Sequence, residues 1–171
     1  MDIALFKTSL AGLLGQMYQI NPTTGLPTSV HIRANAQAPM SLAETDFPTW
    51  ILFTGQAVYP ALPDQTENRL AKETRDFTCS LYVGIAQAGL DGEAERKVQP
   101  YIDPSRNWIQ KHIRLWDGNI LHEVPGVQRA WLIRDTGVAV LRYGNNNPVS
   151  YLGCSFVVRV DVWNEVIYAN Q

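Results

Sequence analysis

The chain has 171 residues, a mass of 19.2 kDa and a formal net charge of −2. Apolar residues make up 46% of it and charged residues 18%, a balance that excludes a disordered tail and indicates one globular domain over residues 1–171. The slightly negative charge argues against stable coating of DNA, because sequence-independent DNA binding needs a basic surface.

The start of the chain lacks the pattern of a secretory signal. Asp2 stands where a signal peptide carries basic residues, and the polar residues 7–9 interrupt the apolar run. No segment reaches the roughly 18 consecutive apolar residues of a membrane span. Cys79 and Cys154 fall on the apolar register of expected strands, which favours two buried thiols over a disulfide or a reactive pair. We therefore expect a soluble cytoplasmic protein that does not contact a membrane.

The first third of the chain predicts one helix and two strands. Apolar residues at three- and four-residue steps predict an amphipathic helix over residues 3–18, with Asp2 as its cap and Pro22 beyond its end. Residues 29–35 alternate between apolar and polar side chains and predict a short, half-buried strand. Residues 50–54 predict a second strand.

Residues 55–73 predict a long loop or arm. They contain prolines and show no sustained apolar period, and loops of this length in compact domains are often functional. Basic and acidic residues alternate at its end, which indicates a salt-bridged interface or a solvated face rather than a nucleic-acid site. The basic residues are Arg69, Lys72 and Arg75, and the acidic ones are Glu67, Glu73 and Asp76.

The stretch DFTCSLYVGI, residues 76–85, predicts a strand with one apolar and one polar face, because its apolar residues alternate strictly. A helix follows, capped by Asp91 and running to about Leu115. Pro100 and Pro104 lie inside it and should kink or split it.

The last third of the chain predicts strands over residues 127–134, 138–143 and 151–163. A tight turn at 135–137 and a polar loop at 145–148 separate them. The order helix, strands, helix, strands indicates an α+β fold.

The triplet Asp135-Thr136-Gly137 is the one local string that matches a catalytic motif. Aspartic proteases carry Asp-Thr-Gly twice, and the paired carboxylates share one proton. A single copy in this chain would require a homodimer. A hairpin turn needs an Asp and a Gly for geometric reasons alone, and we favour this interpretation, with the dimeric protease as an alternative.

Other candidate chemistry is weaker. His31, His112 and His122 do not have the spacing of metal ligands. Glu93 and Glu95 are explained by their position at a helix start, where the helix dipole favours negative charge. The sequence has no Gly-x-Ser-x-Gly elbow and no glycine-rich phosphate loop. We therefore expect no catalytic, metal or cofactor-binding residues and no enzymatic activity.

The tryptophans divide into two groups. Trp50, Trp108 and Trp131 fall on patterns expected of the core. Trp116 and Trp163 each stand at the end of an element beside charged residues, a placement that is common at protein interfaces.

Short strings occur in a characteristic order along nearly the whole chain. They are FPTW at 47–50, ETRD at 73–76, LYV at 81–83, GLDGEAE at 89–95, LRYG at 141–144, YLG at 151–153 and FVVRV at 156–160. In this order, with a helix in front, they resemble the tail terminator (tail completion) proteins of long-tailed bacteriophages.

The resemblance implies a mixed or mainly antiparallel sheet with an N-terminal helix and a central long helix packed on one face. It also implies a virion protein at the tail-neck junction, assembled in the host cytoplasm as a homohexameric ring that ends tube polymerisation and meets the neck. The expected partners are further copies of the chain, the major tail tube protein, a neck protein, and at most transient, non-specific DNA in the lumen. The candidate interface residues are Tyr59, Arg69, Lys72, Arg75, Trp116, Asn145, Asn146, Asn147 and Trp163. A head-closure or connector-adapter protein is the main alternative function.

Overall fold

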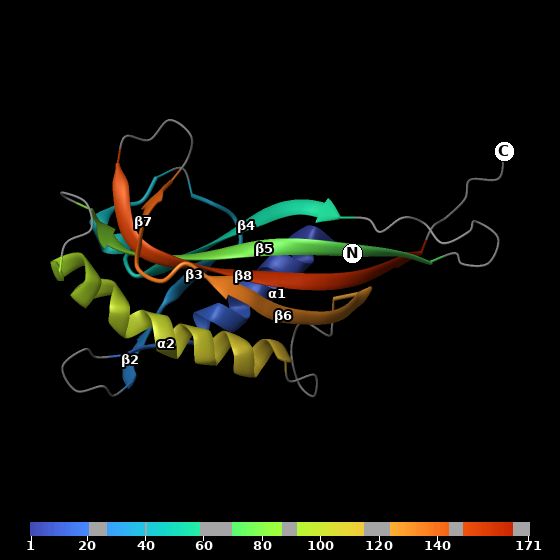
Figure 1. Ribbon diagram of the computed structural model, residues 1–171, viewed down its shortest axis with the longest axis horizontal. Helices are drawn as coiled ribbons and strands as arrows, with labels where there is room; N and C mark the ends of the chain where they lie inside the picture. Colours follow the sequence, from blue (N-terminus) through green and yellow to red (C-terminus); the bar gives the residue numbers. More distant parts are fainter. Residues whose placement is uncertain are drawn as a thin grey trace.

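A six-stranded mixed sheet and two α-helices form the α+β fold of the described residues (Figure 1). The computed structural model describes residues 1–20, 27–39, 41–58, 70–86, 92–114, 124–143 and 149–165. In chain order, the elements are α1 (Ile3–Gly15), β1 (Tyr18–Ile20), β2 (Pro27–His31), β3 (Arg33–Asn35), the 3-10 helix η1 (Glu44–Asp46), β4 (Thr49–Val58), β5 (Leu70–Ile85), α2 (Gly92–Arg114), β6 (Val127–Asp135), β7 (Ala139–Arg142) and β8 (Ser150–Glu165).

The strands of the main sheet follow the order β3-β4-β5-β8-β6, and β7 also pairs with β8. Only β3 and β4 run parallel to each other, while the other pairs are antiparallel. The expected mixed sheet is therefore confirmed. Strands β1 and β2 form a separate antiparallel pair.

Strands β5 and β8 are the longest strands and lie at the centre of the sheet. Each has 16 residues, and they pair from Leu70 opposite Glu165 to Ile85 opposite Tyr151. At about 3.3 Å per residue, the pair extends for about 50 Å. At one end it runs beyond both helices, so that the sheet projects as a narrow blade (Figure 1).

Both helices pack on the same face of the sheet. Phe6 and Leu10 of α1 and Ile102 and Ile109 of α2 share one buried cluster with Phe156 of β8. The remaining even-numbered apolar residues of β8 complete the cluster, as their alternation predicts. They are Leu152, Cys154, Val158, Val160 and Val162.

The opposite face of the sheet is also partly buried, contrary to the expectation of a polar face on residues 76–85. Tyr82 lies in a second cluster with Ile51, Tyr143 and Tyr151, where its ring meets the other two tyrosines edge to face. Burial raises the pKa of Tyr82 to about 12. A tyrosine ring is apolar enough to pack in this way, so the alternation alone underestimates how much of β5 is buried.

Helix α1 confirms the first predicted element. Its N-cap is Asp2, whose Oδ1 accepts a hydrogen bond of 3.0 Å from the Leu5 amide. The helix ends at Gly15, earlier than expected, because β1 begins at Tyr18. The strand expected over 29–35 is two strands, β2 and β3, which belong to different sheets.

The arm expected over residues 55–73 is wrong at both ends. Residues 55–58 belong to β4 and residues 70–73 to β5, and only 59–69 lie outside the described residues. A register shift between Thr54 and Ala57 marks a bulge in β4. Bulges and alternating charges break the simple apolar period, which is why the sequence pattern conceals these strand ends.

Helix α2 is not split by Pro100 and Pro104, both of which lie inside it. Each proline removes one backbone hydrogen bond. The helix is held across these positions by packing, since Val98, Ile102 and Ile109 are all buried against the sheet. Tertiary contacts therefore offset the local penalty.

Cys79 and Cys154 are free and fully buried on the helix-covered face, as expected. Burial raises the pKa of both thiols to about 12. Both therefore act as small core residues.

Candidate functional site

The Asp135-Thr136-Gly137 segment is not a hairpin turn, which corrects the sequence interpretation. β6 and β7 both pair with the same edge of β8, with Asp135 opposite Phe156 and Ala139 opposite Gly153. The two strands therefore lie end to end, and the triplet interrupts one long edge strand. Gly137 has a φ of +63°, a conformation that favours glycine.

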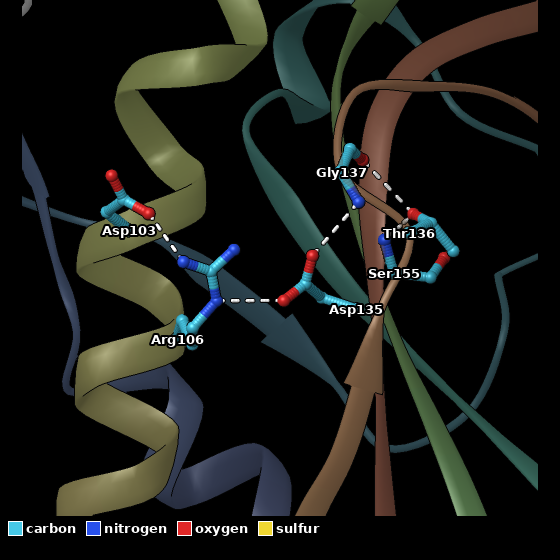
Figure 2. A network of polar contacts seen from close by, with 6 residues as sticks. All are labelled: Asp103, Arg106, Asp135, Thr136, Gly137 and Ser155. Carbon is cyan, nitrogen blue, oxygen red and sulfur yellow. Dashed lines mark hydrogen bonds and ion pairs between the residues drawn. The ribbon is translucent and has the colours of Figure 1, made fainter.

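Thr136 joins the interrupted part of the edge strand to β8 through two hydrogen bonds. The Thr136 amide donates to the Ser155 carbonyl, and the Ser155 amide donates to Thr136 Oγ1, both at 2.9 Å. The threonine side chain thus replaces a missing backbone partner, which keeps the buried amide satisfied. Figure 2 shows this contact beside the carboxylate of Asp135.

The Asp135 carboxylate joins the interruption to helix α2. Its Oδ2 accepts a hydrogen bond of 2.8 Å from Arg106 Nε, and its Oδ1 accepts one of 3.1 Å from the Gly137 amide. Arg106 also pairs with Asp103 one turn earlier in α2, at 2.6 Å. These contacts form one network between the helix and the sheet edge (Figure 2).

The environment of Asp135 favours the ionised form of its carboxylate. The hydrogen bond from Arg106 lowers its pKa below the ordinary value, and the Gly137 amide acts in the same direction. Paired protease carboxylates share a proton because one of their pKa values is raised. The geometry therefore gives the protease alternative no support and identifies Asp135 as a link between helix and sheet.

Replacing Asp135 with Asn is expected to leave the fold intact and to lower the free energy of unfolding by less than about 1 kcal/mol, since solvent screens a pair whose arginine is about a third exposed. Because the folded-state pKa is lowered, the ion pair stabilises the protein above the unfolded pKa of about 3.9, and this contribution is lost as the pH falls further. Urea unfolding of both proteins from neutral pH to below pH 4 measures it. A stability difference that does not shrink toward low pH would contradict this assignment.

On the face of the sheet opposite the helices, charged side chains are paired across strands. Arg159 of β8 donates to both carboxylate oxygens of Asp76 on β5, at 2.8 and 3.0 Å. Arg129 of β6 donates to Asp161 of β8 at 2.7 Å, and Thr74 of β5 donates to the same carboxylate at 2.8 Å. These contacts tie three strands together with opposite charges that cancel.

Trp131 lies on this charged face, so the expectation that it belongs to the core is wrong. It stands opposite Arg159, and the Arg129 guanidinium lies 4.6 Å from the centroid of its ring. This distance is within the range of a cation–π contact. Trp50 is fully buried as expected, while Trp108 is only half-buried and stacks on His112 with centroids 3.8 Å apart.

Arg75 is the one predicted interface residue whose side chain the structure describes. Its Nε lies 2.6 Å from Glu73 Oε1, and only 16% of the arginine side chain and 7% of the glutamate side chain are exposed. One basic residue of the predicted cluster is therefore salt-bridged, but within the chain rather than at an interface, and little of Arg75 is open to a neighbour. Lys72 and Trp163 are opposite each other in β5 and β8, where only their backbone is described. The other predicted interface residues lie outside the described residues: Tyr59, Arg69, Trp116, Asn145, Asn146 and Asn147.

The partners of these charges were not identifiable from the sequence. Arg106 and Asp135 are 29 positions apart, and Arg159 and Asp76 are 83 apart. No local pattern relates such residues. Strand β4 does carry one local signal of an open sheet edge. Its residues 52–58 contain no charged residue and no proline.

Neither a metal site nor a helix that could span a membrane is found in the part of the chain that the structure describes. There, no three His, Cys, Asp or Glu side chains come together as a metal site would require. Neither described α-helix combines the length and apolar character needed to cross a bilayer. The backbone of His31 lies in β2, while His122 and Asp91 fall outside the described ranges. The ring Nδ1 of His112 is 2.9 Å from the Trp108 carbonyl.

Comparison of the chain with protein-family models and with curated protein sequences found no match.

Proposed function

We propose that this protein forms a ring at the head-proximal end of a bacteriophage tail tube, where it ends tube polymerisation and provides the docking surface for the neck. The observation that carries the proposal is the blade. Two 16-residue strands pair along their whole length and run beyond the helices that pack on one face, and the other face carries two ion pairs within the chain.

A ring subunit needs stiffness more than it needs a reactive group. Antiparallel pairing of β5 and β8 fixes the long axis of the subunit, and the ion pairs Arg159–Asp76 and Arg129–Asp161 cross-link its strands. The Arg106–Asp135 pair fastens α2 to the sheet edge in the same way. Identical rigid wedges of this kind can close into a ring through repeated contacts.

The charged face also suits a surface past which DNA moves. Arg129 and Arg159 are paired with carboxylates, and Arg134, opposite Val157, adds one exposed positive charge, so that little net positive charge is left to hold a phosphate backbone. In the proposed ring, DNA therefore makes at most transient, non-specific contact with this face.

Ending polymerisation requires two unlike surfaces. One side of the ring has to match the last ring of the tube, and the other side has to lack the site that the next tube ring would occupy. Of the predicted contact residues, Lys72 lies near the start of β5, at the projecting end of the blade, and Arg69 precedes β5 in the sequence. We assign the tube contact to this end.

The test is to polymerise the major tail tube protein with and without this chain and to examine the tubes by electron microscopy. We expect rings at one end of each tube and shorter tubes as the chain concentration rises. The double variant Arg69→Glu and Lys72→Glu is expected to weaken end binding about tenfold or more through charge reversal. Lys111→Glu makes the same type of charge change on the exposed side of α2 and serves as the matched control.

Three outcomes would contradict the proposal. A chain that neither forms rings nor binds tube ends is not a terminator. Location of the chain on the capsid side of the neck in assembled particles would make it a head-closure or connector-adapter protein. A proteolytic activity that is lost in the Asp135→Asn variant would revive the hydrolase alternative.

A further inference from the structure

The outer edge of β4 has no partner among the described strands along most of its length. β3 pairs with β4 only at Thr49, Trp50 and Ile51, and no other described strand pairs on that side. In residues 52–58, LFTGQAV, the backbone amides and carbonyls that point to this edge therefore have no partner among the described strands. Edges of this kind are normally blocked by charged residues or proline, and this segment contains neither.

The opposite edge of the sheet is blocked. Register shifts occur in β6 between Val127 and Arg129 and again between Leu132 and Arg134, and residues 136–138 interrupt the strand before β7. β4 has a single register shift and no charge over residues 52–58, whereas β6 combines two shifts, an interruption and the charged residues Arg129, Arg134 and Asp135, and proteins use such combinations to prevent strands from pairing at an edge. The two edges are therefore not complementary to each other, and β4 needs a different partner.

The pairing of β4 with β5 shows to which face of the sheet each side chain of β4 points. Phe53 and Val58 lie opposite Thr78 and Thr74 and so point to the face opposite the helices. Thr54 is opposite Phe77 and Ala57 opposite Arg75, on the helix-covered face. Val58 is 63% exposed, more than any other large apolar residue among those described.

We propose that the β4 edge binds the β4 edge of a second copy of this chain, antiparallel and across a two-fold axis. With the axis between Gly55 and Gln56, Phe53 stands opposite Val58 of the second copy, and Thr54 stands opposite Ala57 of the second copy. Each of these pairs combines side chains from the same face, and the exposed valine is covered by an aromatic ring. The bulge lies on the axis in both copies, so that it does not shift the outer pairs.

Neighbouring registers fail for physical reasons. A slip by one residue places Phe53 opposite Ala57, and these two side chains point to opposite faces. A slip by two residues toward the start of β4 brings Val58 of the second copy to Ile51, where β3 already occupies the edge. A strand that is complementary to itself in one register is what a two-fold contact requires.

This inference does not rest on the proposed ring. A two-fold contact is complete with two copies and does not propagate, whereas a ring needs head-to-tail contacts. The pairing would occur in the free protein and would occupy the β4 edge until another partner replaces it.

Sedimentation of the full chain over a range of concentrations tests the inference. We expect a reversible monomer–dimer equilibrium that Val58→Lys weakens about tenfold or more, because the lysine faces an apolar ring at the contact. Val58 is mostly exposed, so the thermal unfolding of this variant, measured at a protein concentration at which both proteins are monomeric, should be unchanged. The matched control is Val140→Lys on β7, at the blocked edge, which should leave the dimer intact.

The register has its own test. Thr54→Lys alone should weaken the dimer. Adding Ala57→Glu in the same chain should restore it, because the lysine of each copy then faces the glutamate of the other copy. A protein that is monomeric at every concentration overturns the inference. So does a dimer that dissociates with Val140→Lys but not with Val58→Lys, and so does a larger ring that Val58→Lys leaves unchanged.

Discussion

Replacing Gly153 with alanine is expected to lower the free energy of unfolding by about 3 kcal/mol or more, at the upper end of what overpacking a core costs. Gly153 lies in β8 opposite Tyr82. A Cβ at this position would overlap the Leu81 carbonyl oxygen and would lie 2.8 Å from Leu141 Cδ1. The carbonyl belongs to the central strand β5 and cannot move without breaking the ladder. Urea unfolding followed by circular dichroism measures the loss.

Gly84→Ala is the matched control for this substitution. Gly84 lies in the neighbouring strand β5, and an added Cβ there would meet no atom within 4 Å. Its stability should therefore change by less than about 1 kcal/mol. Equal losses for the two variants would show that a general cost of replacing strand glycine, rather than the close approach at Gly153, explains the effect.

Replacing Phe156 with alanine is expected to lower the free energy of unfolding by about 3–5 kcal/mol, because it leaves a cavity where the sheet meets both helices. Phe156 is fully buried and lies opposite Cys79 of the neighbouring strand β5. Its ring centroid lies 5.8 Å from that of Trp50. Thermal and urea unfolding measure the change.

Phe156→Leu retains most of the buried volume and should lose only about 1–2 kcal/mol. If alanine and leucine cost the same, the loss would not come from the cavity, and the central position of Phe156 in the core would be contradicted. Val58→Ala provides a surface control, since its side chain is mostly exposed and its loss should hardly affect stability.

These variants separate folding from assembly. Gly153→Ala and Phe156→Ala act on the core of the single chain, whereas Val58→Lys and the reversal at Arg69 and Lys72 act on surfaces. A loss of tube binding in a surface variant is informative only if its unfolding curve matches that of the parent protein.

Elements with a regular pattern could be predicted from the sequence. The cap at Asp2 and the three- and four-residue steps after it specify α1, and the even-numbered apolar residues of β8 specify the buried face of the sheet. Both signals depend only on the period of the backbone and on the hydrophobic effect, which favours the burial of apolar side chains. The α+β class follows from the order of these elements.

The role of the Asp135-Thr136-Gly137 segment could not be predicted in this way. An Asp followed by a Gly with positive φ fits a hairpin turn and an interruption of an edge strand equally well. The difference is made by β8, which pairs with β6 before the triplet and with β7 after it. Likewise, the burial of Tyr82 depends on Tyr143 and Tyr151, which reach it from other strands.

The amino-acid order by itself thus determined the periodic elements, the buried face and the thiols at its centre, because each depends on neighbours within a few positions. Only the tertiary structure decided which charges pair, where the strands β4 and β5 end, and which sheet edge is open. Those features depend on residues as far apart as Asp76 and Arg159, and contacts at that separation arise from the packing of whole strands rather than from any local preference.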